Sequence, residues 1–194
     1  MRKYMNSSQI QAVSILNKGG IIIFPTDTAM GIGCRIDDEK ALKRLFEIRK
    51  RPQEKAMPML ASSKSQALQY LKHPSKQTIQ FMDTYWPGAL TIVDTCDTTI
   101  IPSIIRAGGN TIGIRVPNHD ALREIIEALG MPITGSSANF SGMNTPYTVK
   151  QLDPELRNLV DYVYEEDAKG NEASTVIDCT KEPFVILRQG GVHI

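Results

Sequence analysis

The order of apolar and polar residues predicts a chain in which helices and short strands alternate. The first stretch carries apolar side chains at helical spacing, at Ile10, Val13 and Leu16, after Ser7 or Ser8 as a helix cap. Apolar runs bounded by glycine or proline indicate buried strands. The predicted strands cover residues 21–24, 57–60, 89–93, 111–116, 132–135, 162–164, 175–178 and 184–188.

Two longer stretches have the spacing of amphipathic helices. Residues 38–50 place Leu42, Leu45 and Phe46 on one face and end in a basic cluster before a proline, as helix C-termini do. Residues 120–129 repeat the pattern and stop at a glycine. Several strands lie too close together for helical crossovers, so the pattern predicts a mixed rather than a purely parallel α/β sheet.

Composition excludes several classes of protein. The 194 residues suit one domain, which we expect to cover residues 1–194. A net charge of +1 argues against a protein whose whole surface binds nucleic acid. Cys34, Cys96 and Cys179 form no CxxC pair, which indicates reduced, buried thiols. The N-terminal stretch is polar, and no run approaches the roughly 18 apolar residues of a membrane span, so we expect a cytoplasmic protein.

Charge is uneven along the chain. Residues 40–55 contain seven basic side chains, and residues 153–172 contain seven acidic ones. A basic cluster before a rigid proline, here Arg49, Lys50 and Arg51, suits a polyphosphate and is equally typical of a solvated helix end. One alternative function is therefore a structured-RNA-binding module that uses residues 40–55 as a basic patch.

Two polar loops follow predicted buried strands, which is where α/β proteins bind their ligands. Residues 25–28, with the sequence PTDT, suit a small polar substrate and equally suit a polar turn that satisfies its own backbone. No general base is obvious; Asp27 in this loop is a candidate, and the alternative is that it only orders the loop. Residues 136–142, with the sequence SSANFSG, are a poor core segment and a good hydrogen-bonding cradle.

Arg115 alternates with apolar residues along its predicted strand, so one face of the strand carries a charge. An inward arginine needs an anionic partner, either a carboxylate of the protein or one of a substrate. The P-loop, GxGxxG, HExxH and GxSxG patterns are all missing from the sequence. An enzyme with this sequence is therefore expected to bind and align its substrates rather than to form a covalent intermediate.

Six segments taken together, in this order, resemble the YrdC-like family of threonylcarbamoyl-AMP synthases. They are PTDT with GIGC (25–34), RKRPQEK (49–55), TIGIRVPNH (111–119), SSANFSG (136–142), STVID (174–178) and ILRQGG (186–191). The resemblance implies a twisted open mixed α/β sheet with flanking helices around a positively charged cavity, as in dihydroxybutanone-phosphate synthase. It also implies the single-domain form of the family.

The resemblance further implies a nucleotidyltransferase reaction. The amine of L-threonine is carboxylated by bicarbonate, and the carbamate attacks the α-phosphorus of ATP, which enters with Mg²⁺. Threonylcarbamoyl-AMP and pyrophosphate are the products. A partner transferase then passes the threonylcarbamoyl group to an adenosine of tRNA, and this chain is a candidate for direct contact with that tRNA.

Site residues follow from the resemblance, position by position. The threonine site would contain Thr28, Arg115, Gly135 and Ser174, with Arg115 binding the carboxylate and Gly135 bringing the backbone close to the amino acid. The ATP site would contain Arg49, Lys50, Arg51, Lys55, Thr111, Ser137, Asn139, Thr145 and Arg188. The resemblance implies no metal site built from protein side chains.

The sequence departs from the family pattern at two positions. Arg49 stands where the family usually has lysine, which keeps the charge and loses the compact ammonium group. Met30 stands where the pattern PTxTxYG has tyrosine, so a flexible thioether replaces a hydroxyl and an aromatic wall. Met30 keeps open a second alternative, a divergent paralogue of the same fold that acts on another small substrate.

Overall fold

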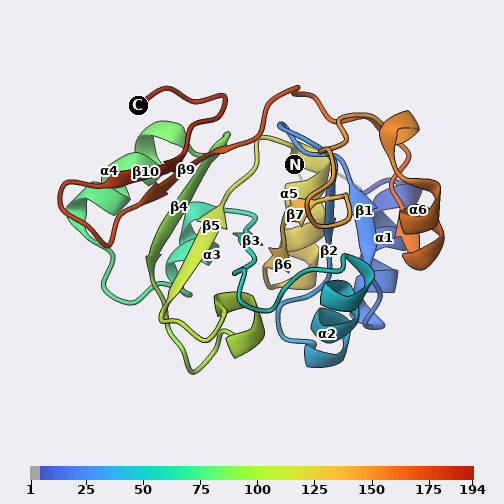
Figure 1. The fold of residues 1–194 in the computed structure, drawn as a ribbon, viewed down its shortest axis with the longest axis horizontal. Coiled ribbons are helices and arrows are strands. Elements are labelled where there is room, and N and C mark those ends of the chain that lie inside the picture. The colour runs from blue at the N-terminus through green and yellow to red at the C-terminus, as the bar shows by residue number, and fades with distance from the viewer. Residues whose placement is uncertain (1–4) are drawn as a thin grey trace.

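The computed structural model describes residues 5–194 and contains helices and strands in alternation (Figure 1). The α-helices are α1 (Ser7–Asn17), α2 (Glu39–Ile48), α3 (Lys64–Leu68), α4 (Lys76–Tyr85), α5 (Asp120–Leu129) and α6 (Pro154–Leu159). Two 3-10 helices, Ser103–Arg106 and Val149–Gln151, lie between them. The strands are β1 (Ile22–Phe24), β2 (Gly31–Gly33), β3 (Met59–Leu60), β4 (Leu90–Thr95), β5 (Thr111–Arg115), β6 (Ile133–Thr134), β7 (Ser136–Ser137), β8 (Tyr162–Val163), β9 (Thr175–Asp178) and β10 (Val185–Arg188).

The strands form two mixed sheets. The smaller sheet has the order β7-β2-β1-β8, and the larger one has the order β10-β9-β4-β5-β3-β6. The pairs β1–β8, β3–β5 and β4–β9 are parallel, and the remaining pairs are antiparallel. The mixed α/β fold predicted from the spacing of the strands is therefore confirmed.

The chain crosses from the larger sheet to the smaller one at a single residue, Gly135. Strand β6, just before it, pairs with β3, and β7, just after it, pairs with β2. A Cβ atom built on Gly135 would lie 2.3 Å from Cγ of Leu60, so a side chain at the crossing would collide with β3. Glycine is needed here for packing between the sheets.

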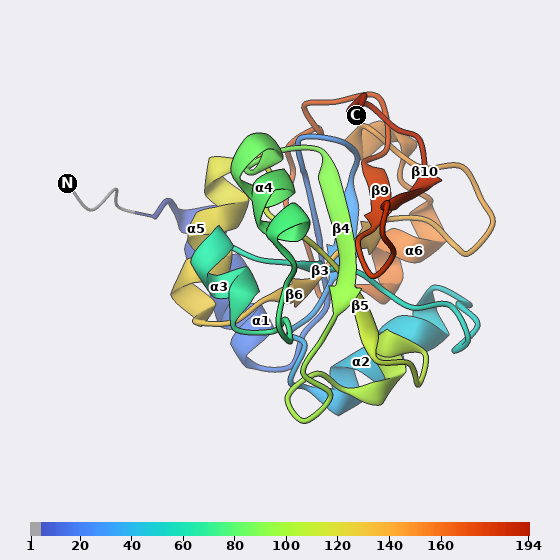
Figure 2. The same ribbon diagram turned by 90° about the vertical axis from the view of Figure 1, so that its left-hand side faces the viewer.

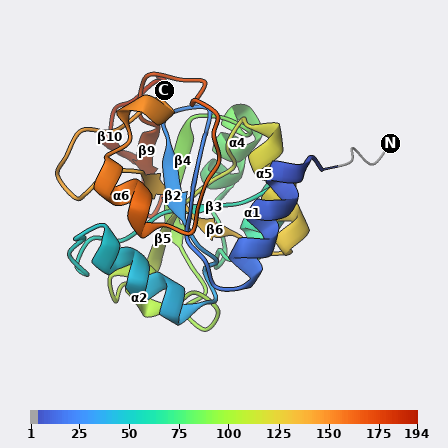
Figure 3. The same cartoon turned by 90° about the vertical axis from the view of Figure 1, so that its right-hand side faces the viewer.

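Helices cover the sheets on two sides. Figure 2 shows α1, α3, α4 and α5 on one side of the strands, with β10 and α6 on the other, and Figure 3 shows α1 lying along α5. The larger buried cluster includes Leu42, Leu45 and Phe46 of α2, as the sequence predicted. A second cluster lies between α1, α5 and the strands β1 and β6. Among residues 5–194 no helix has the length and apolar character to cross a bilayer.

The predicted apolar face of α1 is confirmed at Leu16, with Val13 packed against the core, and is wrong at Ile10. Ile10 is 55% exposed, and the buried side chains are Gln9, Ala12 and Leu16. The helix cap is Asn6, whose side chain accepts a hydrogen bond from the Gln9 backbone. The rotation follows from packing on α5, because the Gln9 side chain donates to a carboxylate on that helix at 2.6 Å.

The strands β2 and β7 and the helix α6 were not predicted as regular structure. Strands β2 and β7 consist of glycine, serine and one isoleucine, a composition with little strand propensity, and they form because they pair with each other. Helix α6 has six residues and begins with a proline capped by Asp153.

The three cysteines are free and buried, as expected.

Candidate active site

A cavity of about 310 Å³ lies between the two sheets. Its walls come from the loop after β1, from the chain after α2 and from strands of both sheets. Among residues 5–194, four arginines and no acidic residue line it. Nine of the residues predicted to bind threonine or ATP lie on this surface: Thr28, Arg49, Arg51, Arg115, Gly135, Ser137, Thr145, Ser174 and Arg188.

The hydroxyl of Thr26 organises the loop after β1. Its Oγ1 accepts hydrogen bonds from the backbone N–H groups of Thr28 at 3.0 Å and Ala29 at 3.1 Å, and lies 2.9 Å from Oγ1 of Thr28. This local pattern is a threonine-based turn. A Cβ on Gly170 would lie 2.5 Å from the Asp27 carbonyl oxygen, so a second loop packs directly on the first. The turn thus satisfies its own backbone and still forms a wall of the cavity.

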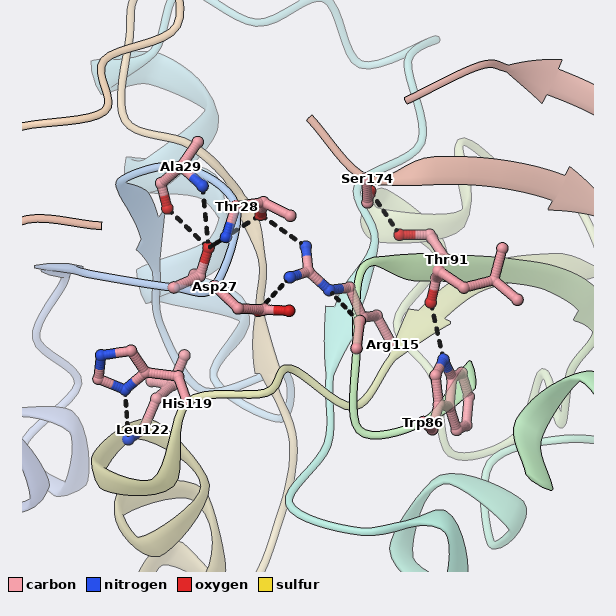
Figure 4. A network of polar contacts seen from close by, with 12 residues as sticks. Asp27, Thr28, Ala29, Trp86, Thr91, Arg115, His119, Leu122 and Ser174 are labelled. Carbon is pink, nitrogen blue, oxygen red and sulfur yellow. Dashed lines mark hydrogen bonds and ion pairs between the residues drawn. The ribbon is translucent and has the colours of Figure 1, made fainter. Parts of the chain in front are cut away.

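Arg115 is held on three sides beneath that loop (Figure 4). Its Nε donates to the Gly88 carbonyl at 2.9 Å, Nη1 donates to Oγ1 of Thr28 at 2.8 Å, and Nη2 forms an ion pair with Asp27. The residue is 5% exposed, and burial lowers the pKa of Arg115 while the Asp27 charge opposes that shift. The anionic partner that the sequence required is thus a carboxylate of the protein. Asp27 itself is not part of the cavity lining.

Arg49 is the other deeply buried arginine of the cavity. It is 2% exposed, and burial, reinforced by the charge of Arg51, lowers the pKa of Arg49 to about 10. Its Nε donates to the Asn139 carbonyl at 3.0 Å and its Nη2 to the Asn139 side-chain oxygen at 3.4 Å. Its Nη1 is buried and has no hydrogen-bond partner within residues 5–194.

Arg51 and Arg188 lie nearer the mouth of the cavity. Arg51 is half-buried and Arg188 is exposed. Arg51 donates to the carbonyls of Lys55 at 3.1 Å and Ala56 at 2.5 Å, and Arg188 donates to both Ser174 oxygens at 2.9 Å. Burial lowers the pKa values of both guanidinium groups. In the part of the chain that the structure describes, neither group has a carboxylate partner, so both are available to an anionic ligand.

Lys50, predicted to bind ATP, points away from the cavity. Its backbone has a φ of +50°, in the left-handed region, directly after α2. Its Nζ lies 4.4 Å from the centroid of the Phe140 ring and 3.7 Å from a Glu155 carboxylate oxygen. This turn places Arg49 and Arg51 on the cavity wall and leaves the lysine between them outside.

Three further predicted ATP contacts are also absent from the lining. Thr111 lies at the opposite end of β5 from Arg115, where it pairs with Thr95 of β4. Lys55 is exposed. Asn139 is 8% exposed and does not line the cavity. Its backbone carbonyl and its side-chain oxygen both accept hydrogen bonds from the Arg49 guanidinium.

Three polar residues of the lining are not among the predicted site residues, although two of them, Thr26 and Ser136, lie in the polar loops 25–28 and 136–142 that the sequence singled out. Thr26 organises the loop described above, and Thr91 of β4 places its Oγ1 2.9 Å from Oγ of Ser174. Ser136 of β7 has a buried Oγ without a hydrogen-bond partner in residues 5–194. A signal existed for Thr91, because a threonine within a buried apolar strand indicates a polar partner on one face.

Met30 forms part of the cavity wall, with no exposed surface. Its backbone N–H donates to the Pro146 carbonyl at 2.9 Å, and its carbonyl accepts from Ala138 at 2.9 Å. The position that departs from the family pattern therefore borders the cavity, is fixed between two loops of the site by its backbone, and belongs to the larger buried cluster.

We expect Met30→Tyr to bind threonine as tightly as the unmodified chain or more tightly, without a loss of thermal stability. The ring can extend into the cavity, its hydroxyl can bond to a bound ligand, and it loses less conformational freedom than methionine. Titration calorimetry and thermal melting measure both quantities, with Met30→Leu as a volume-matched control that lacks a hydroxyl. A severe loss of threonine affinity in a folded Met30→Tyr protein would mean that the pocket is built around methionine.

The mixed α/β fold places four guanidinium groups around one cavity between two sheets, an arrangement suited to small anionic ligands. The chain belongs to the Sua5/YciO/YrdC family, whose family model, described as telomere recombination, matches residues 14–190. A threonylcarbamoyl-AMP synthase of Aliivibrio fischeri is 31% identical over 182 residues, which cover 93% of this chain and 97% of that protein.

Solved structures agree with this assignment. A Pyrococcus abyssi Sua5 complexed with L-threonine matches with a TM-score of 0.87 and 30% identity, over 95% of this chain and 54% of that one. The crystal structure of Escherichia coli YciO matches with a TM-score of 0.81 and 28% identity, over 96% of this chain and 92% of YciO. The chain thus spans about half the length of the P. abyssi relative and nearly the whole of YciO.

Proposed function

We propose that this chain condenses L-threonine, bicarbonate and ATP to threonylcarbamoyl-AMP and pyrophosphate, for the modification of an adenosine in tRNA. The observation that carries the proposal is Arg115, a buried guanidinium fixed by Asp27 and Thr28 in a cavity with three further arginines. Relatives named threonylcarbamoyl-AMP synthase, and a similar Sua5 complexed with L-threonine, support this choice of substrate.

In the proposed complex, the threonine carboxylate contacts Arg115 and Thr28 from the cavity side. Asp27 holds the guanidinium from the other side, so the donors are oriented before the substrate arrives. Asp27 is then a positioning residue rather than a general base, because its carboxylate is engaged with Arg115 outside the cavity lining. Ser174 and the backbone of Gly135 border the same space.

The proposal places the ATP phosphates at the mouth, beside Arg51 and Arg188; Ser137 and Thr145 also line the cavity. Arginine offers bidentate, charge-assisted hydrogen bonds to phosphate oxygens. Within residues 5–194 no group of three or more His, Cys, Asp or Glu side chains is placed to hold a metal ion. A Mg²⁺ ion that enters with ATP would therefore be bound by phosphate oxygens and water, and would neutralise charge on the leaving pyrophosphate.

The reaction needs two bond-forming steps in one cavity. The threonine nitrogen bonds to the carbon of bicarbonate, and the bicarbonate hydroxyl leaves with one amine proton as water. A carbamate oxygen then bonds to the α-phosphorus of ATP, and the bond to the β-phosphate oxygen breaks to release pyrophosphate. Aligning reactants in this way can remove about 7–11 kcal/mol of barrier, which suits a site without a nucleophilic side chain.

The proposal is tested by measuring pyrophosphate release with each reactant omitted in turn. We expect release only when L-threonine, bicarbonate and ATP are all present. The released product would then pass to a transferase partner, which a reconstituted tRNA-modification assay would detect. Release that requires ATP and bicarbonate with a different amino acid would contradict the choice of substrate.

One specific observation favours a second candidate, a paralogue that acts on another small substrate. The cavity wall carries Met30 in place of the tyrosine of the family pattern, and E. coli YciO, described as uncharacterized, is 29% identical over 93% of this chain. The same omission assay, run with a panel of amino acids and other small amines, separates this candidate from the threonine-specific enzyme.

The RNA-binding alternative is weakened by the way the basic segment pairs within the chain. Arg44 contacts Asp161 at 2.5 Å, and Lys50 lies 3.7 Å from Glu155. Both acidic partners belong to residues 153–172, so the acidic segment partly neutralises the basic one. Direct tRNA contact remains an accessory proposal, tested by binding to tRNA at several salt concentrations.

A further inference from the structure

His119 is a buried titratable residue to which the proposed reaction gives no role. It is 2% exposed and caps α5, where its Nδ1 accepts a hydrogen bond from the Leu122 backbone N–H at 3.3 Å (Figure 4). Because Nδ1 acts as an acceptor, a neutral imidazole must carry its proton on Nε2. The second ring nitrogen is therefore a donor.

This donor has no direct hydrogen-bond partner in residues 5–194. Nε2 of His119 is buried, and Oε1 of Glu166 lies 3.7 Å from it, just beyond a direct hydrogen bond. A buried N–H group without an acceptor is costly, so an interaction with Glu166 is favoured. The Glu166 side chain is 47% exposed and has room to approach the imidazole.

The glutamate belongs to a segment that packs on the loop after β1. This covering segment, residues 166–170, donates a hydrogen bond from the Lys169 backbone N–H to the Thr26 carbonyl at 2.9 Å. Its last residue, Gly170, comes so close that a Cβ there would lie 2.5 Å from the Asp27 carbonyl oxygen. The covering segment therefore rests directly on the backbone of the loop.

The same loop is also held by Arg115, which contacts Asp27 and Thr28. Arg115 ends β5, and His119 follows it by four residues, directly before α5. One short connection thus carries two side chains of this part of the site, the guanidinium that binds the loop and the imidazole that faces the covering segment. A change at the imidazole is expected to reach the donors of the threonine site through the loop.

The surroundings of His119 favour the neutral imidazole. Burial is the largest cause and lowers the pKa of His119, and protonation would also turn Nδ1 into a donor and break the bond from Leu122. Four further charged groups act on the ring, three carboxylates that raise this pKa and one ammonium that lowers it: Glu166, Asp27, Asp120 and Lys169. The neutral arrangement is therefore complete above about pH 6.5 and is lost as the pH falls through the lower pKa of the folded chain.

We propose that His119 is a positioning residue for threonine binding, which acts through Glu166 to keep the covering segment on the loop after β1. The inference rests on the proposed function in one respect, the choice of threonine as the ligand that this loop binds. A residue that only caps α5 would leave ligand affinity unchanged in a folded variant that keeps the cap. A positioning residue changes the affinity for threonine and leaves that for ATP unchanged.

Three single variants separate the two roles, with threonine and an ATP analogue titrated by calorimetry at neutral pH. His119→Asn keeps a capping oxygen, since asparagine is a favoured helix cap, and its shorter side chain cannot reach Glu166. We expect His119→Asn and Glu166→Ala each to raise the threonine Kd roughly 3- to 10-fold, the scale of one hydrogen bond, and the nucleotide Kd less than about twofold. Glu165→Ala removes an adjacent carboxylate, paired with Arg157 at 2.7 Å, and is expected to change neither. An unchanged threonine Kd in His119→Asn, or equal losses of both ligands, overturns the proposal.

The pH profile supplies a second readout. Free threonine keeps both of its charges between about pH 5 and pH 7, so a change of its affinity in this range reports on the protein. We expect the threonine Kd of the unmodified chain to rise as the pH falls below about 6.5, and that of His119→Asn to stay nearly constant. The same pH dependence in both proteins contradicts the proposal.

A third measurement needs no ligand and separates this inference from the proposed function. The backbone N–H groups of Thr28 and Ala29 bond to Oγ1 of Thr26, so their hydrogen exchange reports how often the loop opens. We expect exchange at least about threefold faster in the histidine variant and the Glu166 variant than in the unmodified chain or the control. Faster exchange in a chain that binds no threonine upholds the positioning role and refutes the proposed substrate. Unchanged exchange in both variants overturns the inference, whatever the chain binds.

Discussion

Replacing Arg115 by alanine is expected to abolish threonine-dependent pyrophosphate release and to leave nucleotide binding intact. The guanidinium is 5% exposed and fixed by Asp27, Thr28 and the Gly88 carbonyl, so its donors are held in one orientation before a ligand binds. Removing one partner of a buried, hydrogen-bonded charge pair costs about 2–5 kcal/mol, or roughly 30-fold to several-thousand-fold in threonine affinity. Titration calorimetry with threonine, and separately with an ATP analogue, measures the two affinities.

The alanine variant also leaves the Asp27 carboxylate buried without its cation, which lowers the free energy of unfolding. Arg115→Lys controls for this effect, because it keeps a positive charge beside Asp27 and loses the planar, bidentate geometry. We expect Arg115→Lys to fold normally and to bind threonine weakly. Equal losses of threonine and nucleotide affinity in a folded Arg115→Lys protein would mean that Arg115 only supports the fold.

Arg51→Ala is expected to give the reverse pattern, with weakened nucleotide binding and largely retained threonine binding. Arg51 lies at the mouth of the cavity without a carboxylate partner among residues 5–194, and its contacts are two backbone carbonyls that keep the guanidinium in place. A charge-assisted hydrogen bond to phosphate contributes about 1.5–3 kcal/mol, so the nucleotide Kd should rise roughly 10- to 150-fold.

The neighbouring lysine provides the matched control for Arg51→Ala. Lys50→Asn removes a charge one residue away, and asparagine tolerates the left-handed backbone at this position. Because Lys50 lies outside the cavity beside Phe140 and Glu155, its removal should change the nucleotide Kd by less than about twofold. An unchanged affinity in Arg51→Ala, or an equal loss in Lys50→Asn, would make the basic cluster a general charged surface.

The sequence was most informative where a pattern had one local cause. The amphipathic helix α2, with Leu42, Leu45 and Phe46 inward, and α5, which ends at Gly130 in the left-handed conformation, follow from side-chain spacing and capping. The order of the motifs identified nine binding residues that the fold places on one cavity, although they come from segments far apart in the chain.

What the sequence could not supply depends on tertiary contacts. The ion pair between Asp27 and Arg115 joins residues 88 positions apart, and no local pattern specifies it. The left-handed backbone of Lys50 directs its side chain away from the cavity, whereas the sequence placed it in the ATP site. The glycine-rich segment Gly31–Gly33 is a strand because it pairs with β7. The orientation of α1 is set by Gln9 bonding to α5, which outweighs the apolar Ile10.

The most direct test of the proposed function follows a label from bicarbonate into the product. The purified chain is incubated with ATP, Mg²⁺, L-threonine and ¹³C-bicarbonate, and the nucleotide products are analysed by mass spectrometry. We expect threonylcarbamoyl-AMP one mass unit heavier than in unlabelled bicarbonate, with pyrophosphate in equal amount, and neither product with Arg115→Lys at a threonine concentration that saturates the unmodified chain. AMP and pyrophosphate formed without a labelled adduct, or a labelled adduct that carries a different amine, would contradict the proposed function.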